Sequence, residues 1–171
     1  MGEFKKAKQE HKKVSWQREN LIVDGRKIAP TNDDQNFASS THVQHSESES
    51  RIHHGNVTSE QGSSFQAHLI DITNKDNVIP TMHRLYANHN VAKATHNIYA
   101  YRIADKHDII ENSCDDGEYG AGRKLLQLMQ DKNIRNRMIV VTRWYGGKRM
   151  GGRRYQCILE AAEAVVKQVD E

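Results

Sequence analysis

The sequence predicts an α+β protein in which helices pack on a sheet as a two-layer sandwich, formed by residues 63–171. Three patterns indicate this class. Strand-like and helix-like segments follow one another along 63–171 in the order strand, helix, strand, strand, helix, strand, helix. The run 138–142 is continuously apolar, which suits a strand covered on both faces. The last segment carries its apolar residues on one helical stripe.

The first half of this region contains strands around one helix. Apolar and polar residues alternate over 65–69, which predicts a strand. Residues 74–88 have a helical stripe, and the helix is expected to begin near Asn77 because Pro80 fits only in a first turn. Further strands are predicted over 95–103 and, from a weaker pattern, over 108–113.

The second half ends in the longest predicted helix. A helix over 120–132 follows an acidic turn, and acidic residues favour a helix N-terminus through capping and the helix dipole. The apolar strand 138–142 comes next. A glycine-rich loop, 146–152, then joins it to a helix over 153–169.

Residues 1–62 predict a polar, largely disordered N-terminal segment. From residue 31 to residue 62 the chain has few apolar side chains, so it cannot bury enough apolar area to offset its conformational entropy. One short apolar patch, 21–23, precedes Asp24 and Gly25. It could be a strand closed by a turn or a transient apolar motif.

Composition excludes several classes of protein. The mean hydropathy is −0.84, and no stretch approaches the roughly 20 apolar residues of a membrane helix, so no membrane segment is expected. The basic N-terminus lacks the apolar core of a secretory signal. We therefore expect a cytoplasmic protein whose two cysteines, Cys114 and Cys157, are reduced thiols.

The net charge of +3 arises entirely from residues 61–171, and segment 143–154 contains five basic residues and no acidic one. A glycine-rich loop between a strand and a helix can present N–H groups to an anion. A phosphate, an RNA backbone and an acidic protein surface all remain open, as does a mobile loop with solvated arginines. The candidate anion- or RNA-binding residues are Arg143, Lys148, Arg149, Arg153 and Arg154.

The strand over 95–103 contains Tyr99, Tyr101 and Arg102. One interpretation is a half-exposed strand whose polar residues face water. The other is a recognition surface, because aromatic and arginine side chains are the usual anchors of protein interfaces.

The acidic turn contains three carboxylates, Asp115, Asp116 and Glu118. They could hold Mg²⁺ or act as a general acid and base. A capped turn leading into a helix is the favoured interpretation, because nothing in the sequence separates the pKa values of the carboxyl groups. The catalytic motifs GxSxG and HExxH are absent. We therefore predict no catalytic residue, no metal site and no cofactor.

A series of motifs resembles the ancient C-terminal domain of the IMPACT family. It runs from SFQAH (64–68) through ATHNIYAYR (94–102) and DDGEYGAG (115–122) to RWYGG (143–147), and covers about two thirds of the chain. Gly151 and the pair 154–155 complete the series. Three departures are Met150 where leucine is usual, Tyr155 where phenylalanine is common, and the basic pair Lys148-Arg149.

This resemblance implies a fold like the second domain of a small-subunit ribosomal protein, and a regulator of translation under stress that is not an enzyme. Eukaryotic members compete for the large ribosome-associated scaffold that activates the general-control kinase. They thereby act as repressors that keep this kinase from phosphorylating the initiation factor. Some members also bind actin, so actin is a further expected partner. An RNA- or ribosome-binding module that uses 143–154 is the alternative.

The resemblance also indicates partner-binding residues. In eukaryotic members an N-terminal RWD domain carries much of the scaffold binding, whereas residues 1–62 here are too short and too polar for that domain. The expected partner-binding residues are therefore those of the motifs: Tyr99, Tyr101, Arg102, Asp115, Asp116, Glu118, Arg143, Trp144, Tyr145, Gly146, Gly147 and Arg154.

Overall fold

The computed structural model describes residues 21–23, 26–28 and 50–171, in two units that divide after residue 49. In the first unit, β1 (Leu21–Val23) pairs in antiparallel fashion with β2 (Arg26–Ile28). The strand interpretation of this apolar patch is confirmed. The remaining positions of 1–49, for which disorder is predicted, lie outside the described residues.

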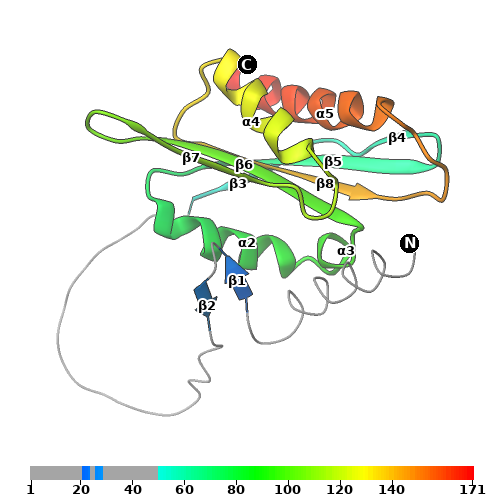
Figure 1. Ribbon diagram of the computed structural model, residues 1–171, viewed down its shortest axis with the longest axis horizontal. Coiled ribbons are helices and arrows are strands. Elements are labelled where there is room, and N and C mark those ends of the chain that lie inside the picture. The colour runs from blue at the N-terminus through cyan, green and yellow to red at the C-terminus, as the bar shows by residue number, and fades with distance from the viewer. Residues whose placement is uncertain (1–20, 24–25, 29–49) are drawn as a thin grey trace, which may run out of the picture. The chain divides into compact units, whose positions relative to one another are not determined.

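The second unit is built on an antiparallel sheet of six strands (Figure 1). Its strand order is β3-β5-β8-β6-β7, and β4 pairs with β5 beyond the end of β3. Long strands therefore occupy the centre of the sheet. The strands are β3 (Ile52–His54), β4 (Thr58–Glu60), β5 (Ser63–Asp71), β6 (His96–Ala104), β7 (Ile109–Cys114) and β8 (Arg137–Trp144).

The sheet begins ahead of the predicted domain boundary at residue 63. Both β3 and β4 lie in the segment assigned to the polar N-terminal region, and both pair with β5. Gln61 and Gly62 have φ values of 49° and 82°, as a two-residue hairpin turn requires, and they close the hairpin of β4 and β5. Backbone pairing with β5 holds these short polar strands in the sheet. A search for apolar periodicity does not predict such strands, because their residues are polar.

Helices cover both faces of the sheet (Figure 1). The pair α4 and α5 forms the sandwich with one face, which confirms the α+β class, and α2 with α3 adds a layer on the other face. Asn77 is the N-cap of α2 and Pro80 lies in its first turn, as predicted. The helices are η1 (Lys75–Asn77), α2 (Val78–Tyr86), α3 (His89–Ala92), α4 (Ala121–Asp131) and α5 (Arg153–Asp170).

Strand β8 divides the core in two. Its side chains alternate between the faces of the sheet, so Ile139 and Val141 pack in the cluster under α4 and α5. Met138 and Val140 pack in the cluster under α2. All four are fully buried, which confirms that the apolar run is a strand covered on both sides.

A buried row of hydrogen bonds crosses four strands beside the second cluster. Asn97 donates its Nδ2 to the Val91 carbonyl at 2.9 Å, and the Thr142 hydroxyl donates to Asn97 Oδ1 at 2.8 Å. Thr142 has no second hydrogen, so His68 Nε2, 3.1 Å from Thr142 Oγ1, must donate. His68 Nδ1 therefore accepts from His54 Nδ1 at 2.8 Å. This row requires a neutral His68.

The first prediction concerns the pH dependence of folding. Burial, and then the nearby His54, lower the pKa of His68 to about 4. An unfolded histidine binds its proton near pH 6.5, so stability that is present above this pH is lost as the pH falls towards 4. We expect a loss of at most about 3 kcal/mol from this group, measured by urea unfolding between pH 7 and 4.5.

His68→Gln is the matched variant. Glutamine keeps a donor for Thr142 but does not titrate, so the free energy of unfolding of this variant should vary less with pH over the same range. Identical pH profiles for the two proteins would contradict the assigned row of hydrogen bonds.

Candidate functional site

The motifs of the sequence meet at a single buried carboxylate, that of Glu118, which is 5% exposed. One oxygen of Glu118 accepts from the guanidinium of Arg143, which stands near the end of β8. The other oxygen accepts from Nε of Arg154 at 2.6 Å, in the first turn of α5. His96 Nε2, at the start of β6, lies 3.5 Å from the same carboxylate. Glu118 thus joins three elements to the turn before α4.

Two aromatic rings, together with the carboxylate of Glu118, hold the guanidinium group of Arg143 in place. Its guanidinium carbon lies 5.6 Å from the ring centre of Phe65 and 5.6 Å from that of Tyr145. Arg143 is 4% exposed, so its charge is compensated by Glu118 and not by solvent. Its Nε is buried without a hydrogen-bond partner among the described residues, so the guanidinium is placed mainly by Glu118 and the rings.

Arg154 and Tyr155 tie the start of α5 to the same turn. The Arg154 guanidinium lies 4.2 Å from the centre of the Tyr155 ring and also donates to the Tyr155 hydroxyl at 2.8 Å. That hydroxyl donates to the Tyr119 carbonyl at 2.7 Å. A phenylalanine at this position has no such donor, so the tyrosine adds a polar contact to the site.

The three carboxylates of the acidic turn do not converge. Asp115 accepts from the backbone N–H groups of Gly120 and Gly122, at 2.9 and 2.8 Å, which caps the start of α4. Asp116 accepts from the backbone N–H of Asn97 at 2.8 Å. With Glu118 bound by arginines, each carboxylate has a different partner. The capped-turn interpretation is confirmed, and residues 50–171 contain no group of three metal-ligating side chains.

The docking role expected for Tyr99, Tyr101 and Arg102 needs correction. Their exposed fractions are 5%, 2% and 7%, because β6 is a central strand with helices on both faces. Arg102 donates to Glu111 Oε2 at 2.8 Å, and its Nη1 lies 3.1 Å from the carbonyl of Met129 near the end of α4. Arg102 therefore stabilises the C-terminus of a helix. The alternative of a half-exposed strand fails for the same reason.

The anion-binding set is also reduced. Arg153 pairs with Glu60 at 2.7 Å and with Glu160 at 2.9 Å, and the hydrogen bonds to Glu60 are the main reason that the pKa of Arg153 is raised above its usual range. Arg143 and Arg154 both pair with Glu118. Only the two remaining basic residues, Lys148 and Arg149, are exposed and have no acidic partner among the described residues.

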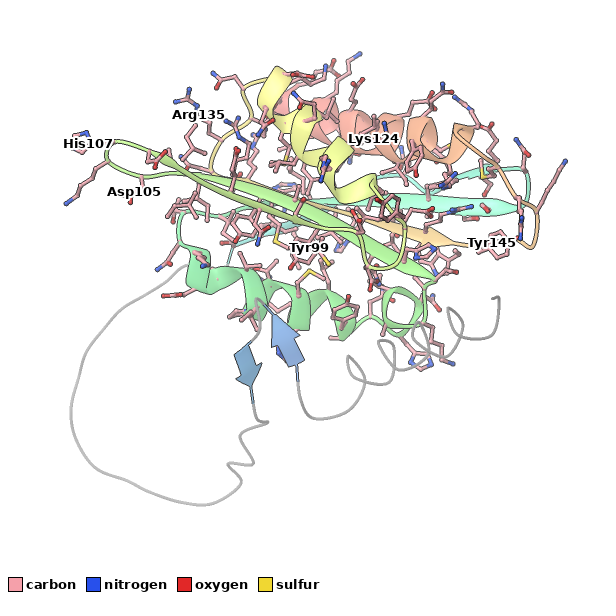
Figure 2. The ribbon with its side chains drawn as sticks, viewed as in Figure 1. Tyr99, Asp105, His107, Lys124, Arg135 and Tyr145 are labelled. Atoms are coloured by element: carbon pink, nitrogen blue, oxygen red, sulfur yellow. The ribbon has the colours of Figure 1, made fainter. Side chains whose placement is uncertain are left out.

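Exposed residues stand next to the members of this buried ion-pair cluster in the chain, Tyr119 after Glu118 and Tyr145 two positions after Arg143. Tyr119 is 86% exposed and Tyr145 is 46% exposed. Lys148 and Arg149 follow Tyr145 in the exposed loop, and we call these four residues the aromatic–basic surface. Figure 2 shows Tyr145 at the end of the sheet opposite Asp105 and His107. Trp144 is half-buried, and its Nε1 donates to the Asn90 carbonyl at 3.0 Å.

Gly146 attaches this loop to the hairpin of β4 and β5. Its N–H donates to Ser63 Oγ at 3.2 Å, and a Cβ atom at Gly146 would lie 1.9 Å from the Gly62 carbonyl oxygen. Only glycine permits this approach. Gly147 has a φ of 89°, which also favours glycine. Gly146 and Gly147 therefore determine the backbone conformation of the loop. The side chains that the loop exposes belong to its other residues.

Sequence reasoning missed two residues, Glu60 and Tyr119. Glu60 lies in the segment assigned to the polar N-terminal region, so its pairing with Arg153 was not expected. Tyr119 was part of a motif but was not assigned a role. Its position between an acidic turn and a glycine is a signal for an exposed aromatic residue.

Comparisons with known proteins agree with the motif series. The model of the Impact N-terminal domain family matches residues 61–166. Protein IMPACT of Rattus norvegicus is 44% identical over 117 residues, and the match covers 67% of this chain and 37% of that protein. Protein IMPACT of Danio rerio is 41% identical, with 68% and 38% covered. The chain therefore spans less than two fifths of the length of these curated relatives.

Two solved structures share the fold. The two-domain translational regulator Yih1 is 25% identical with a TM-score of 0.50, and the match covers 85% of this chain and 55% of that one. A hypothetical protein has a TM-score of 0.60 at 22% identity, covering 70% and 61%, and shows the fold alone. Across the described part of the chain, no helix has the length and apolarity needed to cross a membrane.

The second prediction tests the ion-pair cluster. Glu118→Gln keeps the shape of the side chain but leaves Arg143 buried without a compensating charge. We expect the free energy of unfolding to fall by about 3–5 kcal/mol, measured by denaturant unfolding. Glu163→Gln is the control, because Glu163 pairs with Lys132 at 3.7 Å where both side chains are 48% exposed. The control should change stability by less than about 1 kcal/mol, and equal effects would contradict a central role for Glu118.

The third prediction tests the close approach of Gly146, in the glycine-rich loop, to the backbone of Gly62. Gly146→Ala places a methyl group against the backbone of Gly62 and should lower the free energy of unfolding by about 1–3 kcal/mol. At Gly152 a Cβ would meet nothing within 4 Å, and φ is −67°. Gly152→Ala should therefore remain within about 0.5 kcal/mol of the wild type. Thermal and denaturant unfolding check both values, and a neutral Gly146→Ala would contradict the described loop.

Proposed function

Because the chain belongs to the IMPACT family, we propose that it regulates translation by binding a protein partner. In its specific form, the proposal is that the chain limits activation of the general-control kinase by competing for the ribosome-associated scaffold. It would act as a cytoplasmic repressor in the stress response, with actin as a second partner. Yih1, which is described as a translational regulator, supports the general form.

The observation that carries this proposal is which charged side chains of this region are paired inside the protein and which remain exposed. Arg143 and the half-buried Arg154 both pair with Glu118, and this cluster supports the surrounding loops. What remains outside is a set of two tyrosines and two basic side chains on anchored backbone. Tyrosine and arginine are enriched at the centres of protein interfaces. Tyrosine contributes a large contact area at a low cost in entropy, and arginine contributes several hydrogen bonds and stacking on aromatic rings.

We further propose that the chain acts without catalysis. A general acid and base need carboxyl groups that are free to exchange protons with a substrate. Here Asp115 and Asp116 accept hydrogen bonds from backbone N–H groups, and Glu118 is bound by two arginines. These contacts support a structural role for the acidic turn.

The RNA-binding alternative has less support. Three of its five basic residues are paired with glutamates, which leaves Lys148 and Arg149 for phosphates. Two phosphate contacts give a salt slope of only about −1.4 to −1.8, and correspondingly weak binding at physiological ionic strength. The same two residues are sufficient as the basic part of a protein interface.

The fourth prediction is that the immobilised chain captures the scaffold from a eukaryotic cell extract equally well with and without nuclease treatment. The variant Tyr145→Ala/Lys148→Glu/Arg149→Glu should reduce the captured amount about tenfold, read out by quantitative mass spectrometry. The control Lys106→Glu/Arg135→Glu makes the same change of charge among exposed residues at the other end of the sheet, where Figure 2 labels His107 and Arg135.

Three results would count against these proposals. If the folded wild-type chain does not retain the scaffold, the proposed partner is wrong. If the triple variant retains as much scaffold as the control, the aromatic–basic surface is wrong although the partner is right. If capture depends on RNA and disappears after nuclease treatment, the RNA-binding alternative is favoured.

A further inference from the structure

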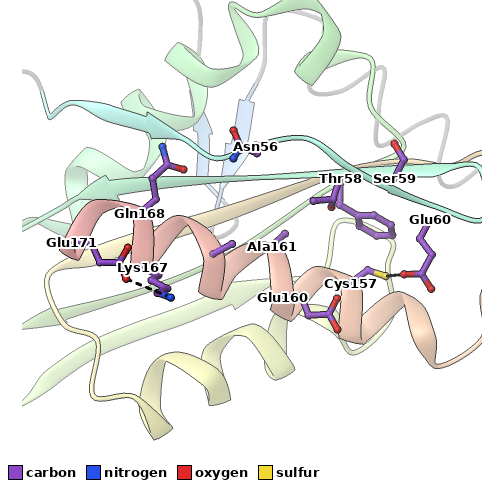
Figure 3. A pocket seen from close by; sticks show the side chains of 12 residues that line it. Asn56, Thr58, Ser59, Glu60, Cys157, Glu160, Ala161, Lys167, Gln168 and Glu171 are labelled. Atoms are coloured by element: carbon purple, nitrogen blue, oxygen red, sulfur yellow. Dashed lines mark hydrogen bonds and ion pairs between the residues drawn. The ribbon is translucent and has the colours of Figure 1, made fainter.

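A groove of about 640 Å³ lies between strand β4 and helix α5, separate from the four residues of the aromatic–basic surface (Figure 3). One wall is the outer strand of the sheet, and the other is one face of the helix. Its floor is apolar or small: Phe65, Cys157 and Ala161 are buried there. The groove is partly open to solvent.

The helix wall has the spacing of a single stripe. Cys157, Ala161 and Ala164 face the groove at intervals of four and three residues, so small side chains line the middle of the wall. Of the long side chains on this wall, Glu160 stands between Cys157 and Ala161. The others, Lys167, Gln168 and Glu171, stand at the end that follows Ala164. The middle of the groove therefore has room for the side chain of a bound molecule.

The strand wall has an open hydrogen-bonding edge. Among the described residues, β4 pairs only with β5. Glu60 and Ser63 flank a two-residue turn, so their backbone groups bond to each other across the hairpin. The next pair, Ser59 and Ser64, is then of the non-hydrogen-bonded kind. Ser59 therefore directs its backbone N–H and C=O to the outer edge, while its hydroxyl contacts Ser64 Oγ at 3.0 Å.

The charge at the rim is slightly negative. Arg153 bridges Glu60 and Glu160, so its single positive charge balances only one of the two negative charges. Lys167 and Glu171 neutralise each other at 3.4 Å. The part of the groove near Glu160 therefore attracts a cationic side chain and repels an acidic one.

We propose that this groove binds an extended peptide segment of a partner protein as an added strand beside β4. The backbone of the peptide pairs with Ser59, a small apolar side chain enters the groove over Phe65 and Ala161, and a basic side chain lies near Glu160. Strand addition next to a helix obtains affinity from main-chain hydrogen bonds and specificity from alternate side chains. This proposal does not depend on the scaffold as partner.

The thiol in the floor fits a binding role. Cys157 donates to Glu60 Oε2 at 3.4 Å, and burial, followed by this carboxylate, raises the pKa of Cys157 to about 11. At neutral pH it is therefore a thiol and not a nucleophilic thiolate. In the groove, Cys157 supplies a small apolar surface.

The fifth prediction is tested with a displayed library of random peptides, each about twelve residues long, selected on the full chain. We expect enriched peptides that contain lysine or arginine and that are extended when bound. The best peptide is then synthesised with a fluorescent label. Its affinity is measured by fluorescence anisotropy for the wild type and for four variants of the chain.

Two pairs of variants separate the groove from other surfaces. Ser59→Pro removes the outward N–H without removing a bond to β5, whereas Ser59→Ala keeps that N–H and removes only the hydroxyl. Ala164→Arg fills the groove from an exposed position of α5, and Gln127→Arg places the same side chain on an exposed position of α4. Ser59→Pro and Ala164→Arg should each weaken binding by about tenfold or more, while their controls bind like the wild type.

Folding of each variant is checked by circular dichroism. If Ser59→Pro does not fold, the pair at positions 164 and 127 decides alone. The proposal is overturned if both groove variants bind the peptide like the wild type, if the selected peptides share an acidic consensus, or if selection yields no binding peptide.

Discussion

The structure depends on one buried carboxylate. Glu118 pairs with Arg143 in the interior and with Arg154 at the start of α5, and removing Glu118 would leave the buried Arg143 without a compensating charge. Because those partners stand on β8 and α5, the carboxylate links the turn before α4 to both elements. The relative placement of these elements is therefore specified by charge as well as by apolar packing.

This arrangement explains why motifs rich in charge belong to the interior of the protein. In a sequence, arginine and glutamate indicate surface, because lone charges are costly to bury. Here they are buried as partners, and the aromatic rings of Phe65 and Tyr145 flank the guanidinium of Arg143. The residues of the aromatic–basic surface, among them Tyr119 and Tyr145, remain exposed outside this interior.

Local patterns were sufficient for much of the fold and for little of the site. The apolar runs in β8 and α5 are read from neighbouring residues, so the class and the positions of these elements followed from the sequence. Whether Tyr101 faces solvent depends on helices distant in the chain, and its burial could not be read locally. Glu60 and Arg153 are 93 residues apart, and no periodicity connects them.

The neighbouring residues Arg153 and Arg154 face in different directions from the first turn of α5. Arg153 reaches the carboxylates at the rim of the groove, and Arg154 reaches the buried Glu118. One helical turn is thereby attached to two regions that have different exposed surfaces. A displacement of that turn would therefore alter the ion pairs in both regions at once.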